Sequence, residues 1–294
     1  KLSATAVDDG HQLNIANGLC ITGRDVGVDF KNLIAKHYSA ELFSGGVDKI
    51  NAWVSKNTKG RIDRIIGQLP PNAVCVILNA IYFKGSWDAE FDRKRTHEAP
   101  FHSGPGKKIT VSMMYREDRY RLLEEKKFQA VEISYKGGNM SMVILLPRQK
   151  EGIGDLENAL TPGTLETWLE ALENQRERKI KLFIPKFTFK TDYSLVPALK
   201  NLGMKDAFTA LKADFSGMGG RKGSLWIAKV KHKAFIDVNE EGAEAAAATG
   251  VAMVTKSIVR RPVFRADHPF LFMIRDRRTG SILFMGRASS PTTE

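Results

Sequence analysis

With 294 residues, the chain is long enough to bury a large core, as one big domain or two smaller ones. Its 45 Lys and Arg residues outnumber its 33 Asp and Glu residues, and the net charge of +12 suits anionic partners such as sulfated glycans. The basic residues are scattered among acidic ones, so a generally basic surface explains the charge as well. No apolar run reaches the length of about 18 residues that a membrane-spanning helix needs.

Hydrophobic periodicity predicts alternating strands and helices in the first third of the chain. The apolar run AVCVILNAIYF is typical of a strand that is covered on both faces. The predicted elements are strands at 13–21 and 74–83 and helices at 28–37 and 47–58.

The rest of the chain is richer in strands, and it contains neither an internal repeat nor a linker between domains. We therefore predict one mixed α+β domain over residues 1–294. Strands are expected at 109–115, 128–135, 140–147, 179–189 and 226–238 and in the stretch leading to Arg287, and helices at 154–160, 165–173 and 195–202, the last closed by Gly203.

The stretch EEGAEAAAATGVAMVTKSIVRR contains two conflicting patterns. Four consecutive alanines favour a helix, whereas the alternate residues from Ala243 to Thr255 are all small, apolar or threonine and would form the buried face of a strand. A segment that can be either an exposed loop or a buried strand is what a conformational switch requires.

Several blocks in this sequence resemble the serpin family. EEGAE followed by alanines resembles the hinge of an inhibitory serpin's reactive-centre loop, and FRADHPFLFMI and FMGR resemble the C-terminal signature and the last core strand. NAIYFKG with Trp87 resembles a third block more than a hundred residues upstream. All the blocks occur in the family's order across nearly the whole chain.

The resemblance implies the serpin fold: a large mixed central sheet, two smaller sheets, surrounding helices and a mobile reactive-centre loop at about 240–262. It also implies that the chain lacks the family's N-terminal helices and first strand. The implied hinge comprises Glu240, Glu241, Gly242, Ala243, Glu244, Ala245, Ala246, Ala247 and Ala248.

The family's spacing from Gly242 makes Lys256–Ser257 the implied scissile bond, with Arg260 and Arg261 as the runner-up. The implied function is suicide-substrate inhibition of trypsin-like serine proteases, in which the cleaved loop enters the main sheet and traps the acyl-enzyme. Such a protein is not an enzyme. The alternative is a non-inhibitory serpin that acts as a carrier or storage protein, although its hinge would tend to carry bulky, charged or proline residues.

Two further groups carry over from the family. Asn79 and His232 match the shutter beneath the middle of the main sheet, although a satisfied core histidine is the simpler interpretation of His232 alone. Trp87, Lys186 and Glu240 match the breach, where the two charged residues would form an ion pair that helps to hold back entry of the loop.

Motifs for other chemistry are absent from the sequence or weak. No catalytic, phosphate-binding or zinc-protease motif occurs, and His97 and His102 suggest a solvated polar loop more than a metal site. Cys20 and Cys75 are expected to be free buried thiols. Asn139 begins the one N-glycosylation sequon.

We expect no cofactor other than a candidate glycosaminoglycan, for which heparin is the model, and no nucleic-acid or membrane partner. The expected protein is a secreted, extracellular monomer, with a cytoplasmic location as the alternative.

Overall fold

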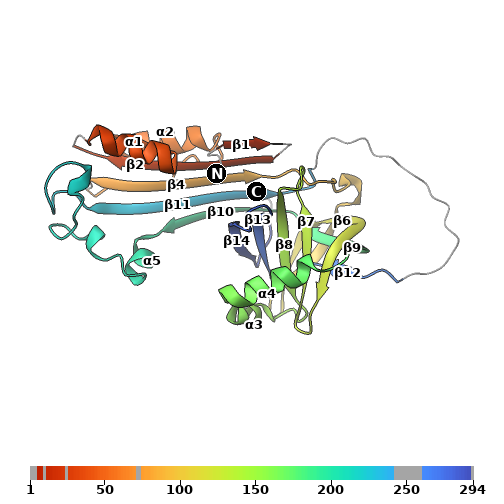
Figure 1. Ribbon diagram of the computed structural model, residues 1–294. Coiled ribbons are helices and arrows are strands. Elements are labelled where there is room, and N and C mark those ends of the chain that lie inside the picture. Colours follow the sequence, from red (N-terminus) through yellow and green to blue (C-terminus); the bar gives the residue numbers. More distant parts are fainter. Residues whose placement is uncertain (1–4, 9–10, 24–25, 71–73, 242–259, 293–294) are drawn as a thin grey trace. The chain divides into compact units, whose positions relative to one another are not determined.

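The computed structural model describes residues 5–8, 11–23, 26–70, 74–241 and 260–292, with side chains from residue 12 onward (Figure 1). They form two compact units, each assembled from separate stretches of the chain. The first consists mainly of Gln12–Lys84 and Phe189–Asp237, and the second of Gly85–Thr188 and the chain from Val238 onward. The expectation of a single domain at 1–294 stays a prediction.

The first unit contains a mixed six-stranded sheet of the described residues, as expected for the serpin fold. Its long strands run side by side in Figure 1. The central strand β4 is antiparallel to β2 and parallel to β11. The order is β1 (Thr5–Asp8), β2 (His11–Ile21), β4 (Cys75–Lys84), β11 (Ile227–Val238) and β10 (Phe187–Ser194), with β3 (Ala40–Phe43) also paired to β2.

Helices α1 (Val28–Tyr38) and α2 (Val47–Asn57) follow β2, and both were predicted. Helix α2 buries Ile50, Trp53 and Val54 against β2 and β4, which is the apolar face expected from their helical spacing. Close packing of Trp53 requires a glycine on β2. A Cβ atom at Gly18 would lie 2.7 Å from the Trp53 ring.

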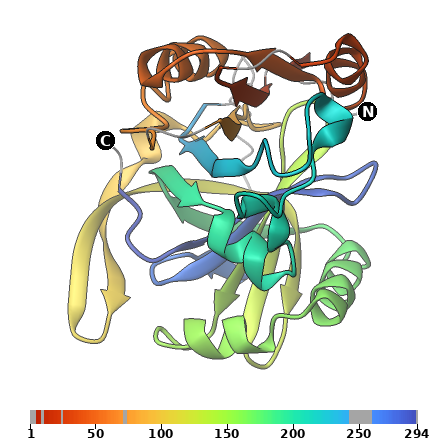
Figure 2. The same cartoon turned by 90° about the vertical axis from the view of Figure 1, so that its left-hand side faces the viewer.

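The connection between β10 and β11 folds into short helices, drawn in cyan in Figure 2. Gly203 follows the first of them with a φ of 100°, a conformation that glycine adopts without steric cost, so the predicted end of this helix is confirmed. These helices are α5 (Val196–Asn201), η2 (Asp206–Phe208) and η3 (Ser216–Met218).

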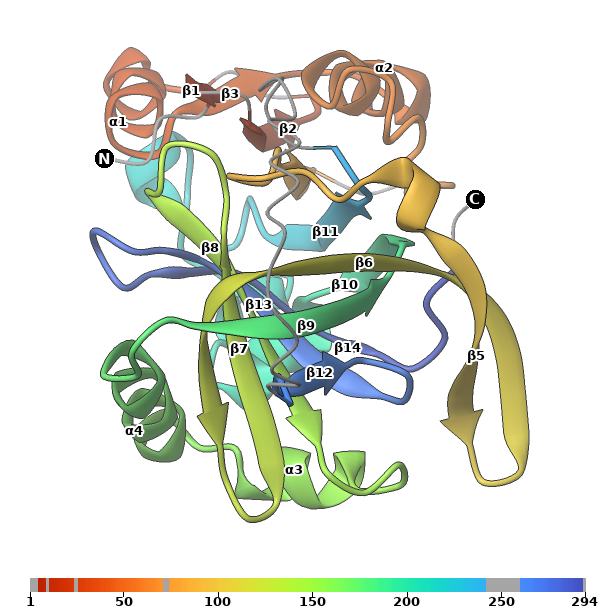
Figure 3. The ribbon, with the colours of Figure 1, turned by 90° about the vertical axis from the view of Figure 1, so that its right-hand side faces the viewer.

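The second unit contains an eight-stranded sheet of the described residues. Helices α3 (Ile153–Ala159) and α4 (Pro162–Glu173) cover the face formed by β7, β8 and β13 (Figure 3). The order is β12 (Val263–Arg265), β9 (Arg178–Pro185), β6 (Lys107–Glu124), β7 (Phe128–Ser134), β8 (Met140–Pro147), β13 (Phe270–Asp276) and β14 (Ile282–Ala288), with β5 (His97–Gly104) paired to β6 and the short helix η1 (Arg93–Arg95) before it.

Several elements differ from the sequence predictions. The polar loop expected around His97 and His102 is strand β5, whose residues pair along β6 despite their polarity. Strand β6 continues to Glu124, nine residues beyond its predicted end, because its charged second half still pairs with β7 and β9. The single strand expected at 179–189 is two strands, β9 and β10, interrupted at Lys186.

Cys20 and Cys75 are both buried and free, as predicted. They belong to separate cores, because Cys20 packs with α2 and Cys75 packs with the helices that follow β10. Among the described residues, no helix is long and apolar enough to cross a membrane.

Candidate functional site

The residues directly after β11 are bound to the segment that begins at Trp87. The indole Nε1 of Trp87 donates to the carbonyl oxygen of Asn239 at 2.7 Å. The backbone amide of Trp87 donates to the carbonyl of Glu241 at 3.1 Å, and the amide of Phe91 donates to the carbonyl of Glu240 at 3.1 Å. The backbone of residues 239–241 is therefore fixed at the point where the predicted hinge begins.

Glu240 and Lys186 form the predicted ion pair. The carboxylate of Glu240 is 5% exposed, and its Oε2 lies 2.9 Å from Lys186 Nζ. The hydroxyl of Thr96 donates to Oε1 at 2.9 Å. Burial alone would raise the pKa of Glu240, but the hydrogen bonds from Lys186 and Thr96 outweigh it and lower the pKa. The pair is thus a partly desolvated charge cluster.

Trp87 fixes this cluster from its apolar side. The indole is 1% exposed and stacks on Tyr135, with ring centroids 4.5 Å apart and planes inclined by 8°. Phe91 approaches the same indole edge-on at 6.0 Å. We call Trp87, Thr96, Lys186 and Asn239–Glu241 the Glu240 cluster. Sequence reasoning missed Thr96, because a single threonine before a strand carries no pattern.

Asn79 and His232 also meet as expected. They are directly paired in the β4–β11 register, and His232 Nδ1 lies 2.6 Å from Asn79 Oδ1. The amide nitrogen of Asn79 donates to Asn17 Oδ1 at 2.7 Å, so its oxygen faces the imidazole and Nδ1 carries the proton. Asn17 in turn donates to the carbonyl of Tyr38 at 3.0 Å. Burial lowers the pKa of His232.

Asn17 on β2, Asn79 on β4 and His232 on β11 therefore form a row of polar side chains across three neighbouring strands. Asn17 pairs with Asn79 in the β2–β4 register, just as His232 does in the β4–β11 register. The sequence did not single out Asn17. A single asparagine within the strand LNIANGLCI carries no pattern, and only the pairing register shows that it faces Asn79.

Strands β4 and β11 are hydrogen-bonded to each other along nearly their whole length, from Ile227↔Cys75 to Asp237↔Lys84. This parallel pair, which we call the β4–β11 seam, has no strand between its two members. A strand formed by the residues that follow β11 would have to reverse direction. It would be antiparallel to both β11 and β4, so it could pair with both if it entered the seam.

On the C-terminal side of the predicted reactive loop, the chain is bound to the second sheet. Arg261 forms an ion pair with Glu117, and the amide of Lys181 donates to the carbonyl of Pro262 at 2.9 Å. Strand β12 then pairs in parallel with β9. Arg260 is exposed. The predicted hinge from Gly242 to Ala248 and the predicted bond Lys256–Ser257 lie outside the described residues.

The structure gives little support for a functional role of the sequon at Asn139 or of His97 and His102. Asn139 lies in the turn before β8, but Ser141 of its sequon is fully buried and donates to Glu132 at 2.8 Å. His97 Nδ1 lies 3.1 Å from the carbonyl oxygen of Arg95, and His102 Nε2 lies 2.8 Å from Lys150 Nζ. Among the residues that the structure describes, no cluster of three or more His, Cys, Asp or Glu side chains could hold a metal ion.

Comparison with known proteins agrees with this geometry. The family model described as "Serpin (serine protease inhibitor)" matches residues 2–291. Serpin B8 of Bos taurus is 43% identical over 274 residues, which cover 89% of this chain and 72% of that protein. The leukocyte elastase inhibitor of Equus caballus is 38% identical over 279 residues, which cover 90% of this chain and 73% of that protein.

The fold is also found in solved structures. Uncleaved ovalbumin superimposes with a TM-score of 0.87 at 30% identity and covers 98% of this chain and 79% of its own. The sequence blocks, the mixed sheet and the family-model match over residues 2–291 all agree. The chain therefore belongs to the serpin family.

Proposed function

We propose that this chain inhibits trypsin-like serine proteases as a suicide substrate. The observation that carries the proposal is the β4–β11 seam, a closed parallel pair whose second strand leads directly into the alanine-rich segment. In the uncut chain, that segment is anchored at both ends, by the Glu240 cluster on one side and by Arg261 and Pro262 on the other. Cleavage between the anchors frees the N-terminal part.

The protease attacks the carbonyl of Lys256 and forms an acyl-enzyme, with Ser257 as the new N-terminus. The freed segment then enters the β4–β11 seam as an antiparallel strand. The 15 residues from Gly242 to Lys256 span about 50 Å when extended, so the attached protease is carried the length of the sheet before water releases it. The gain is a second set of ladder hydrogen bonds and burial of the small side chains on one face.

Two features favour Lys256 over the runner-up. Arg261 is tied to Glu117, and the following Pro262 lacks an amide hydrogen and disfavours cleavage at that bond. Cutting after Arg260 would place the new terminus beside the segment that is bonded to Lys181. Lys256 precedes Arg261 and Pro262 by several residues in the sequence.

The test is to mix the intact protein with trypsin and to look for a covalent complex that survives denaturant. A band that is heavier than either protein, close to their summed mass less the released peptide that begins at Ser257, supports inhibition. Complete cleavage without that band supports the non-inhibitory alternative. Lys256→Ala is expected to abolish the complex, and Lys126→Ala, which changes an exposed lysine in the turn between β6 and β7, is the matched control.

Secretion, glycosylation, glycosaminoglycan binding and a monomeric state are separate proposals. Secretion and a glycan on Asn139 draw no support from the names of the relatives, and the buried Ser141 argues against modification of the folded chain. A glycosaminoglycan that accelerates inhibition, and a monomeric state, rest on net charge and family resemblance.

A further inference from the structure

Strand β11 carries three lysines on one face. Lys229, Lys231 and Lys233 occupy alternate positions, and the period of two along a strand places them in one row. Phe235 continues the row and contacts Tyr82, with ring centroids 5.6 Å apart, in the core that α2 covers. The lysines therefore lie on the same face of the sheet as α2.

The connection between α2 and β4 crosses this row and shapes a cavity over it. Lys229 Nζ donates to the carbonyl of Gln68 at 2.7 Å, and Lys233 Nζ donates to the carbonyl of Arg64 at 2.5 Å. The Arg64 guanidinium turns back toward the carbonyl of Ile66 at 3.4 Å. Arg64, the three lysines and residues 65–67 line a cavity of about 160 Å³.

Among the described residues that line the cavity, Asp192 of β10 is the one carboxylate against four cations. It forms ion pairs with both Lys231 and Lys233, the second at 3.2 Å. Burial alone would raise the pKa of Asp192, but the hydrogen bonds from these two lysines outweigh it and lower the pKa. The cavity is thus lined by one ionised carboxylate and four cationic side chains, so most of the positive charge is not compensated by a lining carboxylate.

The three lysines are only partly exposed. The side chains of Lys231 and Lys233 are 18% and 22% exposed, and their ammonium groups converge on Asp192. A concave site lined by charges of one sign concentrates counter-ions, and ammonium and guanidinium groups donate together to the several oxygens of a tetrahedral anion. The small volume matches one such group rather than a long chain laid flat.

We propose that Arg64, Lys229, Lys231 and Lys233 form a binding site for a phosphate or sulfate group, in which the anion shares Lys231 and Lys233 with Asp192. A phosphorylated small molecule and a sulfated sugar present the same chemistry. Because the site joins β10, β11 and the α2–β4 connection, the bound anion stabilises the folded chain. Binding is independent of protease inhibition, so its test stands or falls separately from the proposed function.

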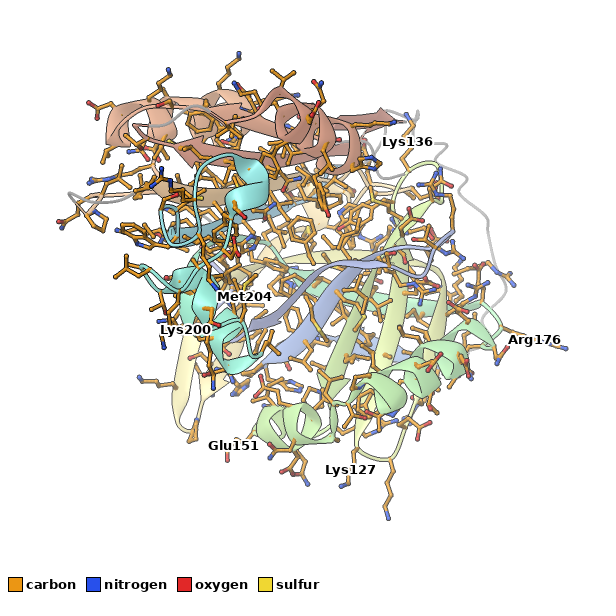
Figure 4. All side chains as sticks on the ribbon, turned by 60° about the vertical axis from the view of Figure 1, so that its left-hand side comes forward. Lys127, Lys136, Glu151, Arg176, Lys200 and Met204 are labelled. Atoms are coloured by element: carbon orange, nitrogen blue, oxygen red, sulfur yellow. The ribbon has the colours of Figure 1, made fainter. Side chains whose placement is uncertain are left out.

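The experiment titrates the intact chain with sodium phosphate and sodium sulfate at constant ionic strength, by calorimetry and by the shift in Tm. Inositol hexakisphosphate and a heparin hexasaccharide, as further probes, separate the phosphorylated source from the sulfated one. The test variant is Lys229→Gln with Lys231→Gln. The matched control is Lys126→Gln with Lys127→Gln, which removes the same charge from an exposed turn (Lys127 in Figure 4).

Saturable binding to the wild-type chain is expected, weakened at least about tenfold in the test variant and changed less than about twofold in the control. Asp192→Asn removes the competing carboxylate and is expected to tighten binding at least about threefold. This variant keeps all four cations, so it also tests the site if the double lysine variant folds poorly. Absence of saturable binding, equal weakening in test and control variants, or weaker binding to Asp192→Asn would overturn the proposal.

Discussion

Removing Lys186 from the Glu240 cluster gives the sharpest stability prediction. In Lys186→Met, the Glu240 carboxylate, which is 5% exposed, would keep the Thr96 hydroxyl but lose its counter-ion. Loss of one partner from a buried pair costs about 3–5 kcal/mol. Because the Lys186 side chain is 27% exposed, water reaches the site in the variant, and we expect a cost of about 2–3 kcal/mol.

The pH dependence of this cost has a definite sign. In the wild-type fold the pKa of Glu240 lies below its ordinary value of 4.5, so the pair stabilises the fold above that pH and the benefit is lost as pH falls through the lower, folded-state pKa. Without Lys186, burial dominates and the carboxylate protonates at a higher pH. The difference between wild type and variant should therefore be largest near pH 7 and shrink in acid.

The assay is the rate of unfolding in urea, because the uncut fold is proposed to be held kinetically. If the pair is broken in the transition state, 2–3 kcal/mol corresponds to unfolding that is about 30- to 150-fold faster. Lys179→Met, an exposed lysine on β9, is the matched control. Unfolding of Lys186→Met within about threefold of wild type, or equal to that of Lys179→Met, would refute the reasoning. Adding Glu240→Gln to Lys186→Met should restore part of the lost stability, because it removes the unpaired charge.

Three further predictions concern the loop and the seam. Ala245→Arg would place a charge on the face that is buried after insertion, so we expect cleavage by trypsin without a trapped complex; undiminished inhibition would contradict insertion. The peptide released from the wild-type complex should begin at Ser257 by mass spectrometry, and a start at Arg261 would reassign the cut to Arg260. Burial lowers the pKa of His232 in the folded chain. As pH falls below about 6.5, His232 is therefore protonated in the unfolded chain before it is protonated in the folded chain, which favours unfolding. Unfolding should accelerate between that pH and the lower folded-state pKa. His232→Gln should flatten this slope, and an unchanged slope would show that another group titrates.

Long apolar runs made the centre of the fold predictable. The uninterrupted apolar run of β4 specifies a buried strand by itself. Polar strands were missed because their sequence does not alternate: β5 contains two histidines and Pro100, and it is stabilised by pairing with β6 rather than by its own pattern. Pairing between distant segments cannot be read from local periodicity.

Some residues of the candidate site could be predicted from the sequence, and others could be found only in the structure. Resemblance to a family identified Trp87, Lys186 and Glu240, whose neighbourhood no local pattern indicates. Thr96 and Asn17 complete the two polar groups, but each is a single polar residue whose role depends on which strand lies beside it. The lysine row of β11 was visible in the sequence as an alternation. The binding site proposed for this row could not be predicted in the same way, because the cavity also depends on the α2–β4 connection, which lies over the lysines.

The most direct measurement of the central claim is the melting temperature of the chain before and after a single cut in the loop. If the freed segment enters the β4–β11 seam, it adds ladder hydrogen bonds on both sides of a long strand, worth on the order of 10 kcal/mol. For a chain of this size, Tm should then rise by at least about 15 °C. Equal melting of cut and uncut protein would contradict insertion and with it the proposed inhibitory mechanism.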